Sequence, residues 1–585
     1  MRHPFTSSFS ASGSFQSSLA LCALALFLGS GSGSGCGSSG ASADANPGEG
    51  CTNGVTECQG GDFVACVDGQ LVLQEACDNA CDSQLGCTFC EPGTSTCTGE
   101  IASVCNPAGT DYEDFLCDSV QGNSCDEGSG QCVGTCSPQS LGNSYIGCEY
   151  FPTVTANEVS NDFAFAVAIA NASNVAANVT IEGGAEAAPI NIVVPPQSVQ
   201  VQPLAWVPDL KAANCNSPFG CGGTTSTGTL SVNGAYHLRS TSPITVYQFS
   251  ALDYQQGANF SYTNDASLLL PSNVLGTDYV VAAWPHWQNG FPGLTAVTAV
   301  ENNTEITMVS SVDTASGTGS PAFSRGVPQT VSLNRGDVLQ VLTTSGDLTG
   351  SRITSNRPIQ VIGGHLCTNV PVNVVACDHL EESLFPVQAM GNRYAVSSAA
   401  LPAIPQGKAR IIRIVATEGD TTLSYDPPQA GAPTSIALAG EFVQLDNNAA
   451  DFLIASNKKI LVAEYMTGQD AGGGAGDPAF TLAVPSEQYR VDYLFHAPTN
   501  YASNYVNVVA ETGTTVTLDG AAIPAASFSP AGGEFSVAKV LLDNSGDGNH
   551  RIESATAFGI TVYGYGDYTS YWYAGGLDLE KLVVE

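Results

Sequence analysis

The sequence has few basic residues. Its 585 residues include 17 Lys or Arg against 54 Asp or Glu, for a formal net charge of −37. A protein that binds nucleic acid or anionic lipid through charge needs a basic face to meet the phosphates. The composition therefore argues against nucleic acid as a partner and against electrostatic docking on a membrane.

Charged residues of either sign are scarce, at 12% of the chain, whereas hydrophobic residues make up 43%. The polar surface must therefore consist mainly of Ser, Thr, Asn, Gln and Gly. Helical periodicity is missing after about position 151, and Val, Ile, Thr and Tyr alternate in runs that end at Gly, Asn, Asp or Pro. These features predict an all-β protein with several cores.

Catalytic motifs are also missing. The chain has no H-E-x-x-H, no nucleophile elbow, and no phosphate-binding Gly loop before a helix. Adjacent acids are easy to find in so acidic a chain, so a pair such as Glu381 and Glu382 does not by itself indicate a glycosidase. We therefore expect a protein that is not an enzyme and needs no cofactor, and a surface hydrolase is the least favoured hypothesis.

Long apolar runs are limited to one short stretch near the N-terminus. Residues 19–28 (LALCALALFL) follow a start with one Arg and no acid. Ten residues are too few to span a bilayer as a helix, but they suit the apolar core of a signal peptide. We expect a signal peptide over 1–35 and a flexible Gly/Ser tether over 36–50.

Cys36 follows Gly33-Ser34-Gly35, which resembles a bacterial lipobox, although Gly33 stands where a lipobox usually has Leu. We expect Cys36 to be lipidated and the protein to be an outer-membrane or cell-surface lipoprotein, in contact with the membrane only through this anchor. Ordinary signal cleavage nearby, which would leave a secreted protein, is the alternative.

Fourteen cysteines fall between Cys51 and Cys148. Gaps of six and then seven residues occur twice, in Cys51/Cys58/Cys66 and in Cys90/Cys97/Cys105. The repeat predicts two six-cysteine modules, at 51–89 and 90–135, which need disulfides because units this small bury too little core. Zinc is the competing interpretation, and the pairing within each module stays open. Two further bonds are expected: Cys136–Cys148 at the junction and Cys215–Cys221 beyond it.

Three markers recur at a period of about 100 residues after the cysteine-rich neck. A hairpin-like unit starts at His237, Arg352, Phe452 and Arg551, and each copy has a strand, a short turn near a Ser, and an apolar strand. Pro and Tyr recur eight positions apart, and a strand pair around a polar turn recurs in the same order. The spacing predicts four tandem antiparallel β-sandwich modules, at 136–265, 266–382, 383–482 and 483–585.

Four sandwiches after a disulfide-rich neck predict an elongated surface protein. One larger fused β-structure is the alternative. A propeller with one blade per repeat is less favoured, because blades repeat at nearer 40–50 residues.

The stretch from Gly363 to Glu382 concentrates reactive side chains. We expect a disulfide between Cys367 and Cys377, because the compartment is oxidising. A metal is the alternative. Its candidate ligands are His365, His379, Glu381 and Glu382.

Two other features are candidate sites. Oxygens at Asp543, Ser545 and Asp547, followed by Gly548, resemble the start of a calcium loop, although a plain turn explains them as well. Aromatic side chains in two clusters could stack on sugars or on a partner, or could fill a core instead. These binding candidates are Trp284, Trp287, Tyr571 and Trp572.

The stretch GGHLCTNV (363–370), followed by CDHLEE (377–382), resembles the N-terminal domain of IgGFc-binding proteins, which occur in mucus and on bacterial surfaces. Residues 146–151 and 267–281 resemble further segments of this family. The resemblance covers about 145 to the C-terminus, and the Cys-rich neck resembles repeats of bacterial surface lipoproteins. The resemblance to IgGFc-binding proteins implies extracellular binding or adhesion to a protein or glycan. No residue of this sequence can be matched to an Fc contact.

The sequence therefore predicts an exported cell-surface binding or adhesion protein. An envelope or matrix scaffold without a discrete ligand is the alternative.

Overall fold

The computed structural model describes residues 51–579, apart from 143, 212–226, 288–289 and 472. The chain forms two compact units, Met1–Cys87 and Thr88–Glu585. In the described ranges, no helix has the length and apolar character needed to cross a membrane. The expected signal peptide, tether, Cys36 and Cys215–Cys221 bond fall outside these ranges.

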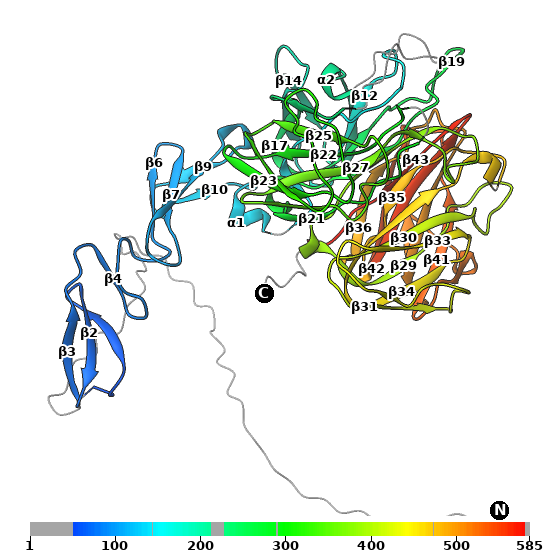
Figure 1. Cartoon of the computed structure of the whole chain (residues 1–585). Helices are drawn as coiled ribbons and strands as arrows, with labels where there is room; N and C mark the ends of the chain where they lie inside the picture. Colours follow the sequence, from blue (N-terminus) through cyan, green and yellow to red (C-terminus); the bar gives the residue numbers. More distant parts are fainter. Residues whose placement is uncertain (1–50, 143, 212–226, 288–289, 472, 580–585) are drawn as a thin grey trace, which may run out of the picture. The chain divides into compact units, whose positions relative to one another are not determined.

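The first unit is a small β-meander followed by a hairpin (Figure 1). Its strands are β1 (Thr56–Gln59), β2 (Asp62–Val67), β3 (Gln70–Glu75), β4 (Ala80–Asp82) and β5 (Gly86–Thr88). Its only buried apolar side chains among the described residues are Val64 and Cys66. Three disulfides take the place of a larger core: Cys51–Cys66, Cys58–Cys81 and Cys77–Cys87.

The second unit begins with another Cys-rich module that repeats this pairing. Its elements are β6 (Ser95–Thr98), β7 (Ile101–Cys105), β8 (Tyr112–Leu116), β9 (Ser124–Asp126) and β10 (Gln131–Val133). Its bonds are Cys90–Cys105, Cys97–Cys125 and Cys117–Cys132. Both modules therefore join their first cysteine to the third, the second to the fifth and the fourth to the sixth. No thiolate of these twelve cysteines is left to bind zinc.

Four β-modules follow, and helix is limited to α1 (Pro138–Leu141), α2 (Pro208–Lys211) and single 3-10 turns in the described residues. Module 1 contains β11 (Gly147–Tyr150), β12 (Phe165–Asn171), β13 (Ala177–Gly183), β14 (Ile190–Val194), β15 (Ser198–Leu204), β17 (Tyr236–Phe249), β18 (Gln255–Gln256), β19 (Asn259–Phe260) and β20 (Ala266–Leu269). Module 2 contains β21 (Asp278–Val280), β22 (Gly293–Ala299), β23 (Thr304–Val309), β24 (Pro328–Leu333), β25 (Val338–Leu342), β26 (Arg352–Ser355), β27 (Ile359–Thr368) and β28 (Asp378–Ser383).

Modules 3 and 4 repeat the same order. Module 3 contains β29 (Gly391–Val396), β30 (Arg410–Ala416), β31 (Thr421–Asp426), β32 (Ser435–Ile436), β33 (Phe442–Asn448), β34 (Phe452–Met466) and β35 (Phe480–Leu482). Module 4 contains β36 (Arg490–His496), β37 (Ser503–Glu511), β38 (Val516–Leu518), β39 (Ala521–Ala522), β40 (Phe528–Pro530), β41 (Phe535–Leu541), β42 (Asn549–Gly566) and β43 (Thr569–Ala574). The 3-10 turns are Ser119–Gln121, Ser272–Val274, Val387–Ala389, Gln469–Ala471, Ser486–Gln488 and Ala525–Ser527.

One long strand organises each module. The first half of β17, β34 or β42 pairs with the module's first and third strands, and the second half pairs with its second and last strands. In module 2 the same role is split between β26 and β27. The hairpin expected from the sequence is therefore wrong in three modules. The Ser marks the place where one continuous strand changes its pairing partners, because the two halves of the strand pair with different strands.

The recurring tyrosine fixes the start of each module. Every copy donates its hydroxyl to a backbone carbonyl of the long strand and accepts the N–H of the residue three before it. The four tyrosines and their carbonyl partners are Tyr150 with Ile244, Tyr279 with Ile359, Tyr394 with Ile460, and Tyr493 with Phe558. In module 1 Gly142 stands where the other modules have proline, so the sequence marker did not reveal this copy.

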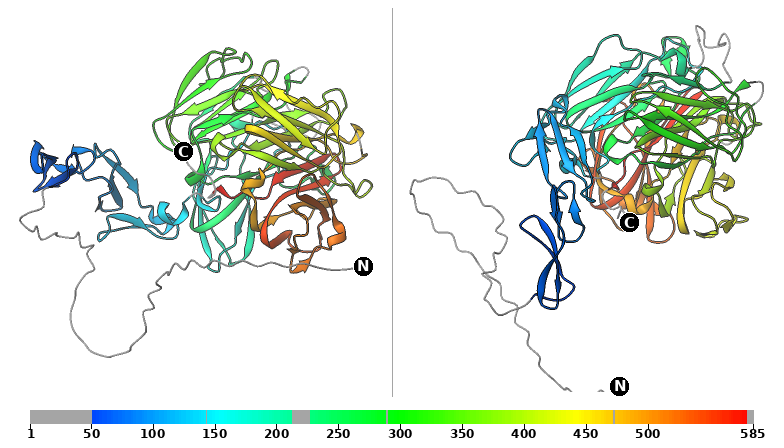
Figure 2. Two further views of the ribbon diagram at one scale, coloured as in Figure 1. Left: turned by 90° about the horizontal axis from the view of Figure 1, so that it is seen from below. Right: turned by 60° about the vertical axis from the view of Figure 1, so that its left-hand side comes forward.

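The four modules form one fused structure rather than a row of separate domains. The largest apolar cluster runs from Tyr145 to Leu579 and includes residues of all four modules, and a separate cluster lies within module 3. The last strands β20, β28, β35 and β43 contact one another in a closed cycle, and Figure 2 shows the modules, coloured cyan to red, packed together. The fused alternative therefore describes this region. β20 pairs with β17, so module 1 extends past the expected boundary at 265, and β16 (Thr229–Ser231) joins the sheet of module 2.

Candidate functional site

The diagnostic stretch Gly363–Glu382 lies at the centre of this cycle, on β27 and β28. A Cβ atom on Gly363 would lie 2.0 Å from the Ala282 carbonyl oxygen, and one on Gly364 would lie 1.9 Å from that of Leu380. Two glycines are therefore required where β27 is crowded from two sides. The structure has a disulfide between Cys367 and Cys377, which closes the loop after β27.

The histidines of the stretch are fully buried. His379 lies 3.4 Å from Glu381 and 3.3 Å from the Thr155 hydroxyl, both measured from Nε2. His365 accepts the N–H of Cys367 through Nδ1. Burial and the neighbouring His286 and His379 lower the pKa of His365 to about 3, so this imidazole is neutral at physiological pH.

The glutamates of the stretch point to different partners. Glu381 accepts the Thr155 hydroxyl at 2.6 Å and the Gln248 amide at 2.7 Å, so both of its oxygens are used. Glu382 accepts the Ser267 hydroxyl at 3.3 Å, and its Oε2 has no hydrogen-bond partner within 3.5 Å among the residues that the structure describes. In the described part of the chain, no group of three His, Cys, Asp or Glu is arranged to hold a metal ion. The two cysteines of this stretch are bonded to each other, and metal binding by its histidines and glutamates stays a prediction.

Asp265 joins all four modules at this centre. Its carboxylate accepts backbone N–H groups from Ala266 in module 1, Glu381 in module 2, Phe480 in module 3 and Trp572 in module 4. The side chain is fully buried. A carboxylate has enough lone pairs to satisfy four donors, so one side chain holds the four last strands in register.

Asp378 makes a second set of bridges. It accepts the N–H of Asn264 from module 1, and the hydroxyl of Thr569 and the N–H of Ser570 from module 4. Burial raises the pKa of Asp378 and of Glu382 well above the usual range, and raises that of Asp477 to about 6. The centre is thus a buried, hydrogen-bonded acid cluster, and its geometry is that of a structural hub.

Three of the four aromatic binding candidates are wrong. Trp284, Tyr571 and Trp572 are at most 2% exposed, so no ligand can reach their rings. Trp284 packs 4.2 Å from the Arg413 guanidinium and 4.7 Å from the Tyr465 ring, measured to centroids. They fill module junctions because large rings bury the most apolar area. Trp287 is half-buried against Phe291.

The loop at Asp543–Asp547 forms two consecutive turns. Asp543 accepts the N–H and the hydroxyl of Ser545, and Asp547 accepts the N–H and the side-chain amide of Asn549. These local bonds are those of Asx turns, and calcium binding here stays a prediction.

A cleft of about 820 Å³ opens between module 1 and the part of module 2 that includes β16 and Thr318. Its polar lining includes Asn161, Asp162, Asp209 and Thr318, and Trp206 supplies an indole. Lys211 donates to the Val159 carbonyl at 2.6 Å and to Asn161, and its ammonium lies 4.8 Å from the Trp206 ring centroid. Burial lowers the pKa of Lys211 to about 8. An indole among carboxylates, an amide and a hydroxyl suits a polar organic ligand.

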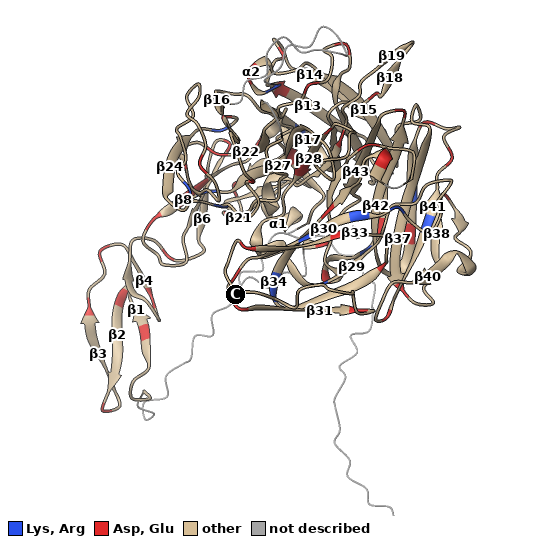
Figure 3. Ribbon diagram, turned by 45° about the vertical axis from the view of Figure 1, so that its right-hand side comes forward, with Lys and Arg blue, Asp and Glu red and all other residues tan. Residues whose placement is uncertain are grey.

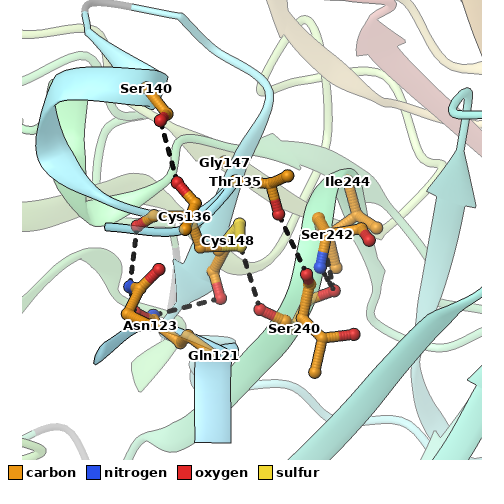
Figure 4. Close-up of a disulfide and its surroundings, with 12 residues drawn as sticks. Gln121, Asn123, Thr135, Cys136, Ser140, Gly147, Cys148, Ser240, Ser242 and Ile244 are labelled. Carbon is orange, nitrogen blue, oxygen red and sulfur yellow. Dashed lines mark hydrogen bonds between the residues drawn. A yellow bond between two sulfur atoms is a disulfide. The ribbon is translucent and has the colours of Figure 1, made fainter. Parts of the chain in front are cut away.

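The second Cys-rich module is fixed to module 1 (Figure 4). A disulfide joins Cys136 to Cys148, and Asn123 donates to the Cys136 carbonyl at 3.0 Å. Thr135 donates to the Thr241 carbonyl at 3.2 Å, and Arg239 of β17 pairs with Asp118 at 2.9 Å. These contacts hold the module against the N-terminal half of β17.

Sequence reasoning missed Asp265 and the Trp206 cleft. Asp265 is a single acid in an acidic chain, and no motif marks an acceptor for four N–H groups. The cleft residues come from separate loops, so they share no spacing.

Residues 265–564 match the family model described as IgGFc binding protein. The human IgGFc-binding protein is 29% identical over 322 residues, which are 52% of this chain and 5% of the human protein. The chain therefore spans only a small part of that relative. The family match starts at the hub residue Asp265, crosses modules 2 and 3 and reaches the end of β42, and so includes most of the fused structure. Because it covers more than half of the sequence, the chain belongs to the IgGFc-binding protein family.

Proposed function

We propose that this chain is an exported, surface-attached protein that binds an extracellular protein or glycan through its fused β-modules. Family membership carries the proposal, because the relative's name states binding of IgG Fc. Eight disulfides among the described residues support an oxidising, extracellular location. The cleft beside Trp206 is the docking site that we infer for the ligand.

If the ligand docks in the cleft, a substitution in the cleft wall should weaken ligand binding. We expect the full chain to capture a ligand from a panel of human IgG Fc fragment and immobilised glycans. Trp206→Ala should weaken that binding about tenfold or more, because it removes the indole that forms one wall of the cleft. Surface plasmon resonance measures the change.

Trp287→Ala is the matched control, since it removes a half-buried indole from module 2 and should leave affinity unchanged. Equal losses in both variants would contradict docking at the cleft. A folded full chain that binds neither panel yet assembles laterally would favour a scaffold.

Attachment at Cys36 has a separate test. We expect the mature protein to begin at Cys36 and to carry acyl chains there, which intact-mass spectrometry detects directly. Cys36→Ser should release the protein into the medium, because a single anchor then has no replacement. A mature N-terminus at another residue would leave the binding proposal intact and overturn the anchor.

A further inference from the structure

Each Cys-rich module contains a three-stranded sheet, and β3 and β8 are each one of the two edge strands of these sheets. β3 pairs only with β2, and β8 pairs only with β7, in the sheets of the described chain. Every residue of both strands is exposed. An edge strand presents free N–H and C=O groups that can pair with another extended chain, and natural proteins usually blunt such an edge.

The free backbone groups of β8 can be assigned. Cys117 donates its N–H to the Glu100 carbonyl, and Asn106 donates to the Asp111 carbonyl. Because backbone groups alternate in direction along an antiparallel strand, residues 111, 113, 115 and 117 face β7. The N–H and C=O groups of Asp114 and Leu116 therefore face outward, at the open edge.

Apolar side chains cluster on these edges. On β8, Tyr112, Phe115 and Leu116 are 40%, 41% and 62% exposed, and Ile101 beside Leu116 is 39% exposed. On β3, Leu71, Val72 and Leu73 are 37%, 43% and 55% exposed. A continuous run of exposed apolar residues on an open edge marks an interaction surface.

The charge of the Cys-rich modules indicates which kind of partner could bind at these edge strands. Residues 51–135 contain fourteen Asp or Glu and no Lys, Arg or His, and Figure 3 shows acidic residues without basic ones on β1–β4. Glu113 and Asp114 lie within β8 itself. A second copy of this chain, with its own net charge of −37, would be repelled, as would an anionic lipid surface. A cationic polypeptide would be attracted.

We propose that the outer edge of β8 is a docking site for an extended, Lys- or Arg-rich segment of a partner protein, which adds a strand to the sheet. β3 offers a second site of the same kind. Main-chain hydrogen bonds would supply the pairing, the apolar side chains would cover Tyr112 and Leu116 on one face of the sheet, and the basic side chains would meet Glu113 on the other face. This surface is distinct from the ligand cleft beside Trp206.

The probe is a fluorescent octapeptide of alternating Lys and Val, titrated into the full chain and followed by anisotropy. We expect it to bind about tenfold more tightly than a peptide of the same charge in which two Val are replaced by Pro, because Pro removes strand hydrogen bonds and leaves the charge. Hydrogen exchange should slow in segments 112–116 and 70–75 when the peptide binds.

Glu113→Lys should remove the protection of segment 112–116 and leave that of 70–75 in place. Glu127→Lys is the matched control, since it makes the same charge change on an exposed residue of the β9–β10 turn. Equal affinity for the two peptides would overturn the proposal, as would protection confined to segments outside β3 and β8. Binding of IgG Fc or glycans is a separate readout, so failure here leaves the proposed function untouched.

Discussion

Replacing Asp265 by Ala is expected to lower the free energy of unfolding of the fused β-modules by at least ~4 kcal/mol, since each buried N–H left without an acceptor costs about 1–3 kcal/mol. Four such groups, one from each module, lose their acceptor together. The damage should spread beyond module 1, because the last strands of all four modules share this one carboxylate. Guanidinium denaturation of the full chain, followed by tryptophan fluorescence, measures the loss.

Asp313→Ala is the control for this prediction. Asp313 is exposed and accepts a single backbone N–H, from Arg325 at 2.8 Å, so its loss should cost about 1 kcal/mol or less. Asp265→Asn should fall between wild type and Asp265→Ala, because the amide keeps one acceptor oxygen. Similar stability of Asp265→Ala and Asp313→Ala would show that Asp265 does not hold the modules together.

Glu382→Gln is expected to stabilise the protein at pH 7 relative to wild type and to leave stability at pH 4.5 nearly unchanged. Burial and the neighbouring Asp265 raise the pKa of the Glu382 carboxyl well above its usual range. The folded protein therefore keeps the proton at a pH where the unfolded chain has lost it. Stability from this group is complete below the unfolded pKa and falls by about 1.4 kcal/mol per pH unit as pH rises toward the folded pKa.

Glutamine cannot ionise, so the variant does not lose this stability as the pH rises. Denaturation curves of wild type and variant at pH 4.5, 6 and 7 give the difference directly, and titrating groups that do not interact with Glu382 cancel in it. Glu305→Gln, on an exposed residue of β23, should show no pH-dependent difference. A Glu382→Gln effect of equal size at all three pH values would contradict a raised pKa.

Much of the fold was predictable because it depends on local pattern. The Pro-x7-Tyr marker found three module starts, since each tyrosine must sit at a fixed distance from the turn that aims its hydroxyl at the long strand. The cysteine gaps predicted both small modules because a disulfide needs its two Cα atoms within about 7 Å, which restricts the spacing of the cysteines. Three of the four aromatic candidates were wrong because exposure is a property of the packed modules, which sequence spacing does not report.

The place where the long strand changes its pairing partners was interpreted as a hairpin for a related reason. A Ser between two apolar runs is compatible with a turn and with a bend, and the choice depends on which strands pair with each half. Those partners lie tens of residues away, beyond the reach of a local pattern.

The sequence by itself determined the all-β class, the four-fold repeat, the disulfide-rich neck, the acidic character and the family. Each of these properties depends on the type and spacing of residues along the chain. Only the tertiary structure decided that the four modules close around Asp265, that the Gly363–Glu382 stretch is buried at their centre, and that a cleft lies beside Trp206. These features arise where residues from different modules meet, so the free energy that creates them depends on long-range burial and hydrogen bonding, which no local motif encodes.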